Sequence, residues 1–314
     1  SGMEGHLTDG VVEVGANARE RYYDSRGYGR PRGDGVVLSR VEAAHLLYRG
    51  DLGSVDGQGI AGFLADNGDI VVPFLVYKDL RDRGFYVSPA REGWVDDPEG
   101  AAFVAHPRGD GPWDGTVQYR IRVLGERASV TLDSLGDVVL AVVDEESELT
   151  YLRTDVPEIT GTSSAGIDGP IEGHLLEDRV LCWTPPPALY ERGFYGQRMD
   201  RDDDAVQLSL LEAAYLAGEG LLAVDGGTEA IESRGRVVEG ERFDRRLTVY
   251  RALRDRGVVP KTGLLVRVLP ADAVLSPRDL ALDVRLAHGV RKRMVFALVD
   301  GETVHWRSIE RLTP

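Results

Sequence analysis

The sequence contains the same pattern of segments twice, and this duplication constrains the fold more than any other feature. LSRVEAAHLL at 38–47 returns as LSLLEAAYLA at 208–217, and YKDLRDRGFYV at 77–87 returns as YRALRDRGVVP at 250–260. EGHL at 4–7 returns at 172–175, and VVLAVVD, which ends at Asp144, returns as VFALVD, which ends at Asp300. Four matches in the same order predict two copies of one unit of about 150 residues.

The join between the two copies has the composition of a linker. Residues 156–170 are rich in Gly, Ser, Thr and Pro, which is typical of a domain boundary. We therefore expect a first repeat at 4–160 and a second repeat at 171–314. Residues 1–3 read as a tag remnant ahead of a start methionine, and we exclude them from the fold prediction.

Both repeats are predicted to mix strands and helices. Short apolar runs at 10–14 and 179–183 read as strands. Ser39 and Ser209 each precede a glutamate by three residues, which predicts a capped helix start. A second helix is expected to end at a left-handed glycine in each repeat. In the second repeat, a third helix is expected from Ser276 to about Arg293, followed by a buried strand at 294–299, a turn and a last strand. The fold class is therefore α/β, of the mixed α+β kind.

The two repeats differ in length at one place. The spacing of the matching segments shows that the second repeat is 17 residues shorter between its second helix and its third. Where the first repeat has a long stretch with strands and an acidic, Gly-rich loop, the second has only VVPKTGLLVRVLP. This deficit predicts that one substructure of the first repeat is missing from the second.

The charge of the chain is strongly negative, and its basic residues are almost all arginine. The formal net charge is -15, and only three of the 37 basic residues are lysines: Lys78, Lys261 and Lys292. Acid excess with few lysines is what a high-salt cytoplasm favours, and a GC-rich genome would also favour arginine. The single cysteine, Cys182, indicates a reducing, cytoplasmic location. No apolar run approaches the roughly 20 residues of a membrane helix, so no membrane partner is expected.

Positive charge gathers in one short stretch of this acidic chain. Arg285, His288, Arg291, Lys292 and Arg293 fall within nine positions. Spacings of three and seven residues place the first, second and fourth of these on one face of a helix. Without further information this pattern is typical of a solvated helix face or of cations near a helix C-terminus.

At this point the sequence resembles a known family. The duplicated unit, the segments YRALRDRGVVPKTG and LAHGVRKRMVFALVD, and the closing VHWRSIERLTP are similar to the archaeal tRNA-splicing endonuclease in its two-repeat, homodimeric form. The resemblance implies small N-terminal α/β subdomains and nuclease-like C-terminal subdomains. It also implies cleavage of precursor tRNA at bulge–helix–bulge junctions, without metal or cofactor, to leave a 2′,3′-cyclic phosphate and a 5′-hydroxyl.

The resemblance assigns roles to three residues. Lys292, in GVRK, matches the catalytic lysine of the family, while Arg285 and Arg307 match two arginines that sandwich a bulged base. A catalytic tyrosine and histidine follow the KTG segment in the family, but no tyrosine or histidine lies between Thr262 and Pro270 here. Cleavage by a 2′-hydroxyl needs a base, an acid and a cation beside the phosphate. We therefore expect the chain to bind RNA and to cleave it poorly.

Several alternatives stay open. Either the tyrosine and histidine segment is truly deleted, or the sequence omits a segment that the natural protein has. The chain is either an endonuclease weakened in this way or a non-catalytic RNA-binding or scaffold protein on the same duplicated fold. In both cases the expected partners are precursor tRNA and a second copy of the chain, and not DNA. Tyr77, Tyr250 and Trp306 are expected to be packing residues, and His288 is expected to be structural or adjacent to RNA.

The dimer contacts are also predicted. The acidic loop at 94–115 is expected to dock on a basic groove of the second copy, as an acidic loop does in the family. The last strand, with Val304, Trp306 and Ile309, is the candidate for pairing across the two-fold axis.

Overall fold

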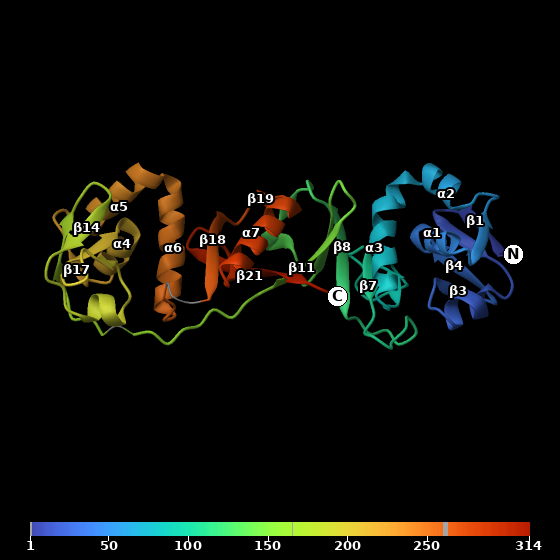
Figure 1. Cartoon of the computed structure of the whole chain (residues 1–314), viewed down its shortest axis with the longest axis horizontal. Coiled ribbons are helices and arrows are strands. Elements are labelled where there is room, and N and C mark those ends of the chain that lie inside the picture. The colour runs from blue at the N-terminus through green and yellow to red at the C-terminus, as the bar shows by residue number, and fades with distance from the viewer. Residues whose placement is uncertain (1, 165, 260–262) are drawn as a thin grey trace.

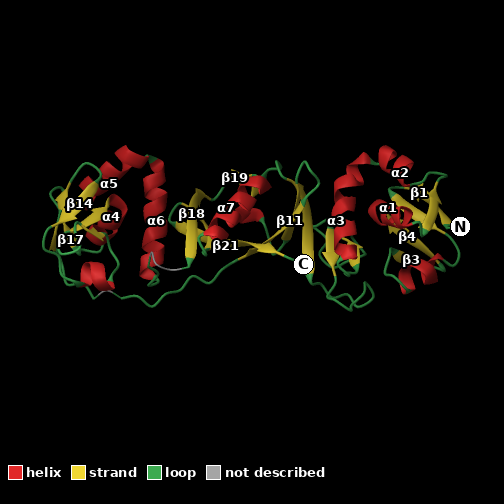
Figure 2. Ribbon diagram, in the orientation of Figure 1, coloured by secondary structure: helices red, strands yellow, loops and turns green. Residues whose placement is uncertain are grey.

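The computed structural model describes residues 2–164, 166–259 and 263–314. The molecule is elongated, with one small subdomain at each end and a sheet of both repeats between them (Figure 1). Long helices α3 (Val71–Asp82) and α6 (Glu241–Asp255) lie between each end subdomain and the central strands (Figure 2). The mixed α/β class and the tandem duplication are confirmed.

The two end subdomains have the same strand order. The first has a five-stranded sheet in the order β3-β4-β2-β1-β5, and the second has a four-stranded sheet in the order β13-β14-β16-β15 beside the pair β12-β17. The first sheet comprises β1 (Met3–Thr8), β2 (Val11–Val14), β3 (Arg30–Arg32), β4 (Gly35–Ser39) and β5 (Leu52–Val55). The second set comprises β12 (Ile171–Glu172), β13 (His174–Leu175), β14 (Arg179–Cys182), β15 (Gln197–Arg198), β16 (Val206–Ser209) and β17 (Leu222–Ala223).

The helices of the end subdomains begin where the sequence predicts. Helices α1 (Arg40–Arg49) and α4 (Leu210–Gly218) both start at a serine whose side chain accepts from the backbone N–H of the glutamate three residues on. That glutamate bonds back to the serine N–H, so both capping boxes are confirmed. Two further helices, α2 (Ile60–Asp66) and α5 (Gly227–Glu239), lie before α3 and α6 and were not predicted.

Met3 belongs to the fold. It starts β1 and pairs with Leu52 of β5, although residues 1–3 were excluded from the fold prediction. Among the described residues, no single helix is long and apolar enough to cross a membrane. The stretches Ile60–Asp66 and Gly68–Asp82 meet that test only together, and they are bent by 101° relative to each other.

The central sheet joins the two repeats into one structure. Its eight strands run in the order β18-β20-β21-β11-β10-β8-β7-β6. The first repeat contributes β6 (Val87–Pro89), β7 (Phe103–Ala105), β8 (Tyr119–Gly125), β10 (Val139–Val143) and β11 (Leu149–Asp155). The second contributes β18 (Leu264–Pro270), β20 (Arg293–Asp300) and β21 (Thr303–Leu312), with helix α7 (Pro277–Gly289) on one face.

The repeats meet about an internal pseudo-two-fold axis. In the antiparallel pairing of β11 with β21, Arg153 lies opposite Glu310 and Thr154 lies opposite Ile309. The repeats are offset by 156 residues here, so Arg153 of the first repeat corresponds to Ile309 of the second, and Thr154 corresponds to Glu310. Exchanging the repeats therefore converts one pair into the other, as a two-fold relation requires. A smaller ladder between β9 (Val130–Thr131) and β19 (Val274–Leu275) is antiparallel as well.

This pairing overturns one prediction about the dimer. β21 was expected to pair with a second chain, yet it lies between β20 and β11 of its own chain. Ile309 belongs to the core under α7, while Trp306 belongs to the core on the other face with Val304 packed against it. β21 is already paired because the duplication places its partner strand, β11, in the same chain.

The length difference between the repeats has two parts. In the first repeat, 34 residues separate Gly84 from β8, and they include β6 and β7; in the second, only six residues separate Gly257 from β18. The connection from β18 to β20 is longer than that from β8 to β10, 22 residues against 13, because it contains α7. The deficit that was expected at one place is therefore the sum of two differences: the second repeat has fewer residues before β18, and the residues of α7 partly make up for this loss.

Candidate RNA-processing site

The basic stretch lies where α7 ends and β20 begins. α7 ends at Gly289, four residues before the predicted end, and Arg291 adopts a left-handed conformation with φ 57°. The Lys292 N–H donates to the Ala287 carbonyl at 2.8 Å, which closes the turn. Lys292 therefore lies beyond the helix, and the expectation that it shares a helix face with Arg285 and His288 is wrong.

The side chain of Lys292 is free to act on a ligand. Lys292, Arg285, His288 and Arg291 are all exposed, and no hydrogen bond or ion pair engages their side chains within the described ranges. β18 and β20 are parallel and start side by side, with Leu264 opposite Arg293. The lysine thus lies at the starting edge of two strands and beside the C-terminus of α7, where the helix dipole favours positive charge.

Arg307 lies on the same face of the sheet as α7. Its neighbour Trp306 points into the opposite core, so alternation along β21 directs Arg307 toward the α7 side. Its guanidinium donates to the Trp306 carbonyl at 2.9 Å and lies 3.5 Å from the Asp133 carboxylate. No direct contact joins Arg307 to Arg285 in the described part of the chain, so the structure places both on one face without bringing their side chains together.

An open groove adjoins the outer edge of β18. It has a volume of about 1220 Å³ and lies between the second end subdomain, α6 and β18. Its lining includes Tyr190, Phe194, Tyr250, Arg254 and the apolar strand residues Leu264 and Val266. β18 ends the eight-stranded sheet, so its outer backbone groups have no strand partner among the described residues.

The equivalent space in the first repeat is filled. There β7 pairs with β8, with Phe103 opposite Ile121, and β6 pairs with β7. Trp113 packs edge-on against both Tyr23 and Tyr86, at ring distances of 5.6 and 5.7 Å. The groove in the second repeat is therefore the space that the connection carrying β6 and β7 occupies in the first.

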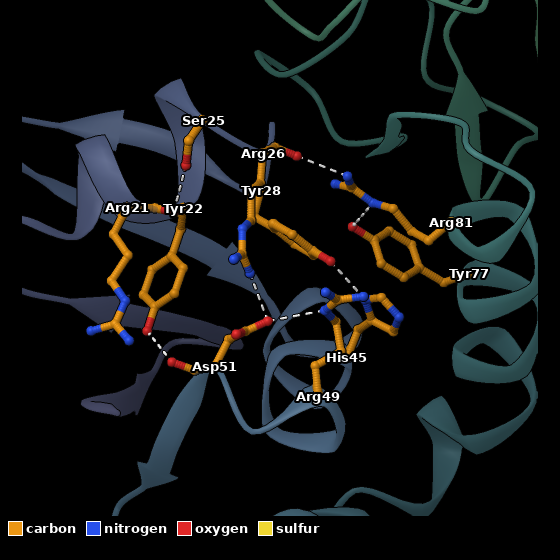
Figure 3. Close-up of polar contacts among 10 residues, drawn as sticks. All are labelled: Arg21, Tyr22, Ser25, Arg26, Tyr28, His45, Arg49, Asp51, Tyr77 and Arg81. Carbon is orange, nitrogen blue, oxygen red and sulfur yellow. Dashed lines mark hydrogen bonds and ion pairs between the residues drawn. The ribbon is translucent and has the colours of Figure 1, made fainter. Parts of the chain in front are cut away.

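A buried cluster of charged and aromatic residues joins each end subdomain to its long helix, and the sequence analysis missed it. In the first repeat, the Arg81 guanidinium lies 3.9 Å from the centre of the Tyr28 ring and donates to the Arg26 carbonyl (Figure 3). It also donates to the Gly27 carbonyl. In the second, Arg254 lies 3.8 Å from the Tyr195 ring and donates to the Gly193 carbonyl. The repeated RDRG segment was the available signal for this arginine.

The tyrosines of this cluster confirm one prediction. Tyr77 is fully buried and its hydroxyl accepts from Arg81, while Tyr250 accepts from Arg254 in the same way. Burial raises the pKa of both phenols. Both are packing residues, as expected, and Trp306 is buried as expected as well.

His45 makes the first cluster sensitive to pH. Its side chain is 1% exposed, its Nδ1 lies 2.8 Å from the Tyr28 hydroxyl, and burial lowers its pKa to about 4, helped by Arg81 and Arg49. Because the folded pKa lies below the unfolded value of about 6.5, stability is complete above pH 6.5 and falls as the pH drops toward 4.

We expect the free energy of unfolding to fall by about 2 kcal/mol because of His45 when the pH is lowered from 7 to 5. The matched variant is His45→Tyr, because Tyr215 holds the same place in the second repeat. Urea unfolding at both pH values should show a smaller loss in the variant than in the parent chain. Equal losses in the two chains would contradict a neutral, buried His45.

The acidic loop at 94–115 is anchored to its own repeat. The Trp94 carbonyl accepts from Arg30 at 2.7 Å, and Trp113 packs on Tyr23 as described above. Docking of this loop on a second chain stays a prediction.

Lys261 lies outside the described residues. The described residues contain no group of three or more His, Cys, Asp or Glu side chains placed to hold a metal ion.

Comparison with known proteins defines the class first. Residues 3–66 and 171–235 each match the family model of the tRNA intron endonuclease N-terminal domain, so the two end subdomains are copies of one domain. Residues 264–306, which run from β18 into β21, match the model of the tRNA intron endonuclease catalytic C-terminal domain. The fold, with Lys292 inside that catalytic domain, is thus of the tRNA intron endonuclease class.

Full-length relatives then give the family. The tRNA-splicing endonuclease of Natronomonas pharaonis is 69% identical over 99% of this chain and all of the relative. The tRNA-splicing endonucleases of Haloarcula marismortui and Haloferax volcanii are 58% and 51% identical over the same shares. The chain belongs to the tRNA-splicing endonuclease family, and its similarity to haloarchaeal members agrees with its acidic composition.

Proposed function

We propose that the chain recognises precursor tRNA at bulge–helix–bulge junctions and carries part of a metal-independent cleavage site. The observation that carries this proposal is the placement of Lys292, which is exposed and unpaired among the described residues, at the end of α7 and the start of β20. An ammonium group there offsets the negative charge that develops on a phosphate when a neighbouring 2′-hydroxyl attacks it. The reaction leaves a 2′,3′-cyclic phosphate and a 5′-hydroxyl.

The base and the acid of this reaction belong to a segment that the chain lacks. Among the described residues, the outer edge of β18 has no strand partner and adjoins a groove, where the first repeat has β6 and β7. The alignment with the Natronomonas relative covers 336 positions, more than the 314 residues of this chain, so it includes positions with no residue here. Both observations support a missing segment of two strands before β18, which would bring the tyrosine and histidine toward Lys292.

RNA recognition is assigned to Arg285 and Arg307. In high salt, contacts with phosphate lose much of their counterion-release gain, so stacking of a bulged base on an arginine carries more of the affinity. Both arginines lie on the α7 side of the sheet. A guanidinium donates through its edge and stacks through its faces, so hydrogen bonds do not prevent stacking.

Binding to two RNAs in molar salt tests this proposal. Replacing both Arg285 and Arg307 by alanine should weaken binding to a bulge–helix–bulge RNA by about tenfold or more, on the scale of two stacking contacts. Binding to a plain duplex of the same length should change by less than about threefold. Equal losses on the two RNAs would contradict base stacking.

A second candidate function is a non-catalytic RNA-binding or scaffold protein on the same fold. The absence of any tyrosine or histidine between Thr262 and Pro270 favours it. Both candidates predict RNA binding, and they differ in whether the site becomes catalytic when the missing segment is supplied. The homodimer is part of the first proposal. Because β21 is already paired inside the chain, the acidic loop at 94–115 remains the candidate contact between two copies. Light scattering, which measures molar mass, tests this contact in a variant whose acidic loop residues are neutralised.

A further inference from the structure

The first repeat reaches the RNA-binding face of the second through one carboxylate. Asp133 lies in η3 (Leu132–Ser134), a short helical turn that follows β9 in the first repeat. Its Oδ1 lies 2.8 Å from His305 Nδ1 and 3.5 Å from the Arg307 guanidinium, both of which belong to β21. Its backbone carbonyl also accepts from Arg307, at 3.5 Å. A residue 174 positions upstream thus contacts the arginine assigned to a bulged base.

Asp133 is the acidic partner of Arg307 within the described residues. The Arg307 side chain is 19% exposed, and its Nε is buried without a hydrogen-bond partner in that part of the chain. The remaining restraints on the guanidinium are the Trp306 carbonyl, which belongs to the adjacent residue, and the two oxygens of Asp133. Without the Asp133 carboxylate, the guanidinium would keep only the 3.5 Å contact with the backbone carbonyl of residue 133, and the long arginine side chain would regain rotamer freedom.

We infer that Asp133 is a positioning residue that holds Arg307 in the orientation needed to stack on a bulged base. This inference rests on the proposed function of Arg307. A guanidinium donates through its edge and stacks through its faces, so an ion pair and a hydrogen bond with Asp133 are compatible with a base on one face. In this view the first repeat supplies more than a scaffold, because it contributes a residue to the RNA site of the second.

Electrostatics alone predicts the opposite effect of removing this residue. RNA is a polyanion, so deleting a carboxylate near its binding face should tighten binding to any RNA, or leave it unchanged in high salt. A positioning role predicts weaker binding of bulged RNA only. The sign of the change therefore separates the two roles.

The experiment measures the affinity of the full chain for a bulge–helix–bulge RNA and a matched duplex in molar salt. Asp133→Ala should weaken binding to the bulged RNA about fivefold and leave duplex binding unchanged or tighter, while Asp133→Glu should recover part of the loss. The matched control is Asp283→Ala, which also removes one carboxylate, on α7, where Asp283 pairs with Arg267. The control should not weaken either complex.

Two further measurements keep the outcome clear. In an Arg307→Ala background, Asp133→Ala should cause no further loss, because the positioned group is gone. Thermal unfolding shows whether Asp133→Ala simply destabilises the fold. If it does, His305→Ala is the matched destabilised variant, because it removes the other partner of Asp133 and leaves the Asp133–Arg307 contact in place. Unchanged affinity in Asp133→Ala, or equal losses on both RNAs, would overturn the inference. If the parent chain itself does not prefer bulged RNA, the proposed function fails first.

Discussion

We expect this chain to cleave a bulge–helix–bulge RNA at least about 10⁴ times more slowly than the full-length Natronomonas relative, measured under single-turnover conditions without divalent metal. The reason is chemical: a positioned general acid and a positioned general base each contribute roughly 10²–10⁴-fold, and in our proposal both belong to a segment that this chain lacks. In this proposal the positive charge of Lys292 would still stabilise the reacting phosphate but would move no proton from the 2′-hydroxyl. Single-turnover rates at saturating enzyme separate this chemical defect from weaker binding.

A control variant tells this explanation apart from a misfolded site. Lys292→Ala should lower the residual rate of this chain by no more than about tenfold, because groups that act as a unit are strongly non-additive. Affinity for the bulged RNA should stay within about threefold of the parent chain, since recognition is assigned to Arg285 and Arg307. A rate within tenfold of the relative would show that a base and an acid are present after all.

Replacing Arg81 by methionine should lower the free energy of unfolding of the first end subdomain by about 3 kcal/mol or more. The change removes the contact with the Tyr28 ring and the donors to the carbonyls of Arg26 and Gly27. It also leaves the buried Glu42, which accepts from the Gly29 N–H, with less compensating positive charge. Hydrogen exchange of the α1 amides measures this local opening directly.

Two matched variants define the size of that effect. Arg254→Met in the second repeat should destabilise the second end subdomain by a similar amount, because its contacts with Tyr195, Tyr250 and the Gly193 carbonyl are equivalent. Arg127→Met is the surface control, because Arg127 pairs with Glu145 where both side chains are about two-thirds exposed. Its effect should stay below about 0.5 kcal/mol. A similar loss in all three variants would contradict a special role for the two half-buried arginines, Arg81 and Arg254.

Local signals in the sequence predicted the local structure well. Ser39 and Ser209 predicted two capped helices because the side chain that satisfies the helix N-terminus lies within three residues of it. Gly84 and Gly257 have φ of 93° and 73°, as expected after the ends of α3 and α6. The predicted end of α7 was too late. The chain leaves the helix through Arg291 in a left-handed conformation, and a left-handed residue is readily predicted from sequence only when it is a glycine.

Long-range pairing was not readable in the same way. The duplication predicted two similar units, but not that β11 and β21 would pair inside one chain and leave β21 without a free edge. The link between Asp133 and Arg307 spans 174 positions and has no local signature. At the candidate site, the resemblance gave Lys292, Arg285 and Arg307, while the groove beside β18 became visible only when the two repeats were compared in space.

The most direct test of the central claim supplies the segment that we propose is missing. The residues that the Natronomonas relative carries between its counterparts of Gly257 and Leu264 are inserted at that point of this chain, and cleavage of bulge–helix–bulge RNA is followed without divalent metal. We expect the rate to rise by at least about 10³-fold, with 2′,3′-cyclic phosphate ends, and Lys292→Ala to remove most of the gain. No gain from a folded insertion that still binds the RNA, or a gain that does not depend on Lys292, would contradict the account.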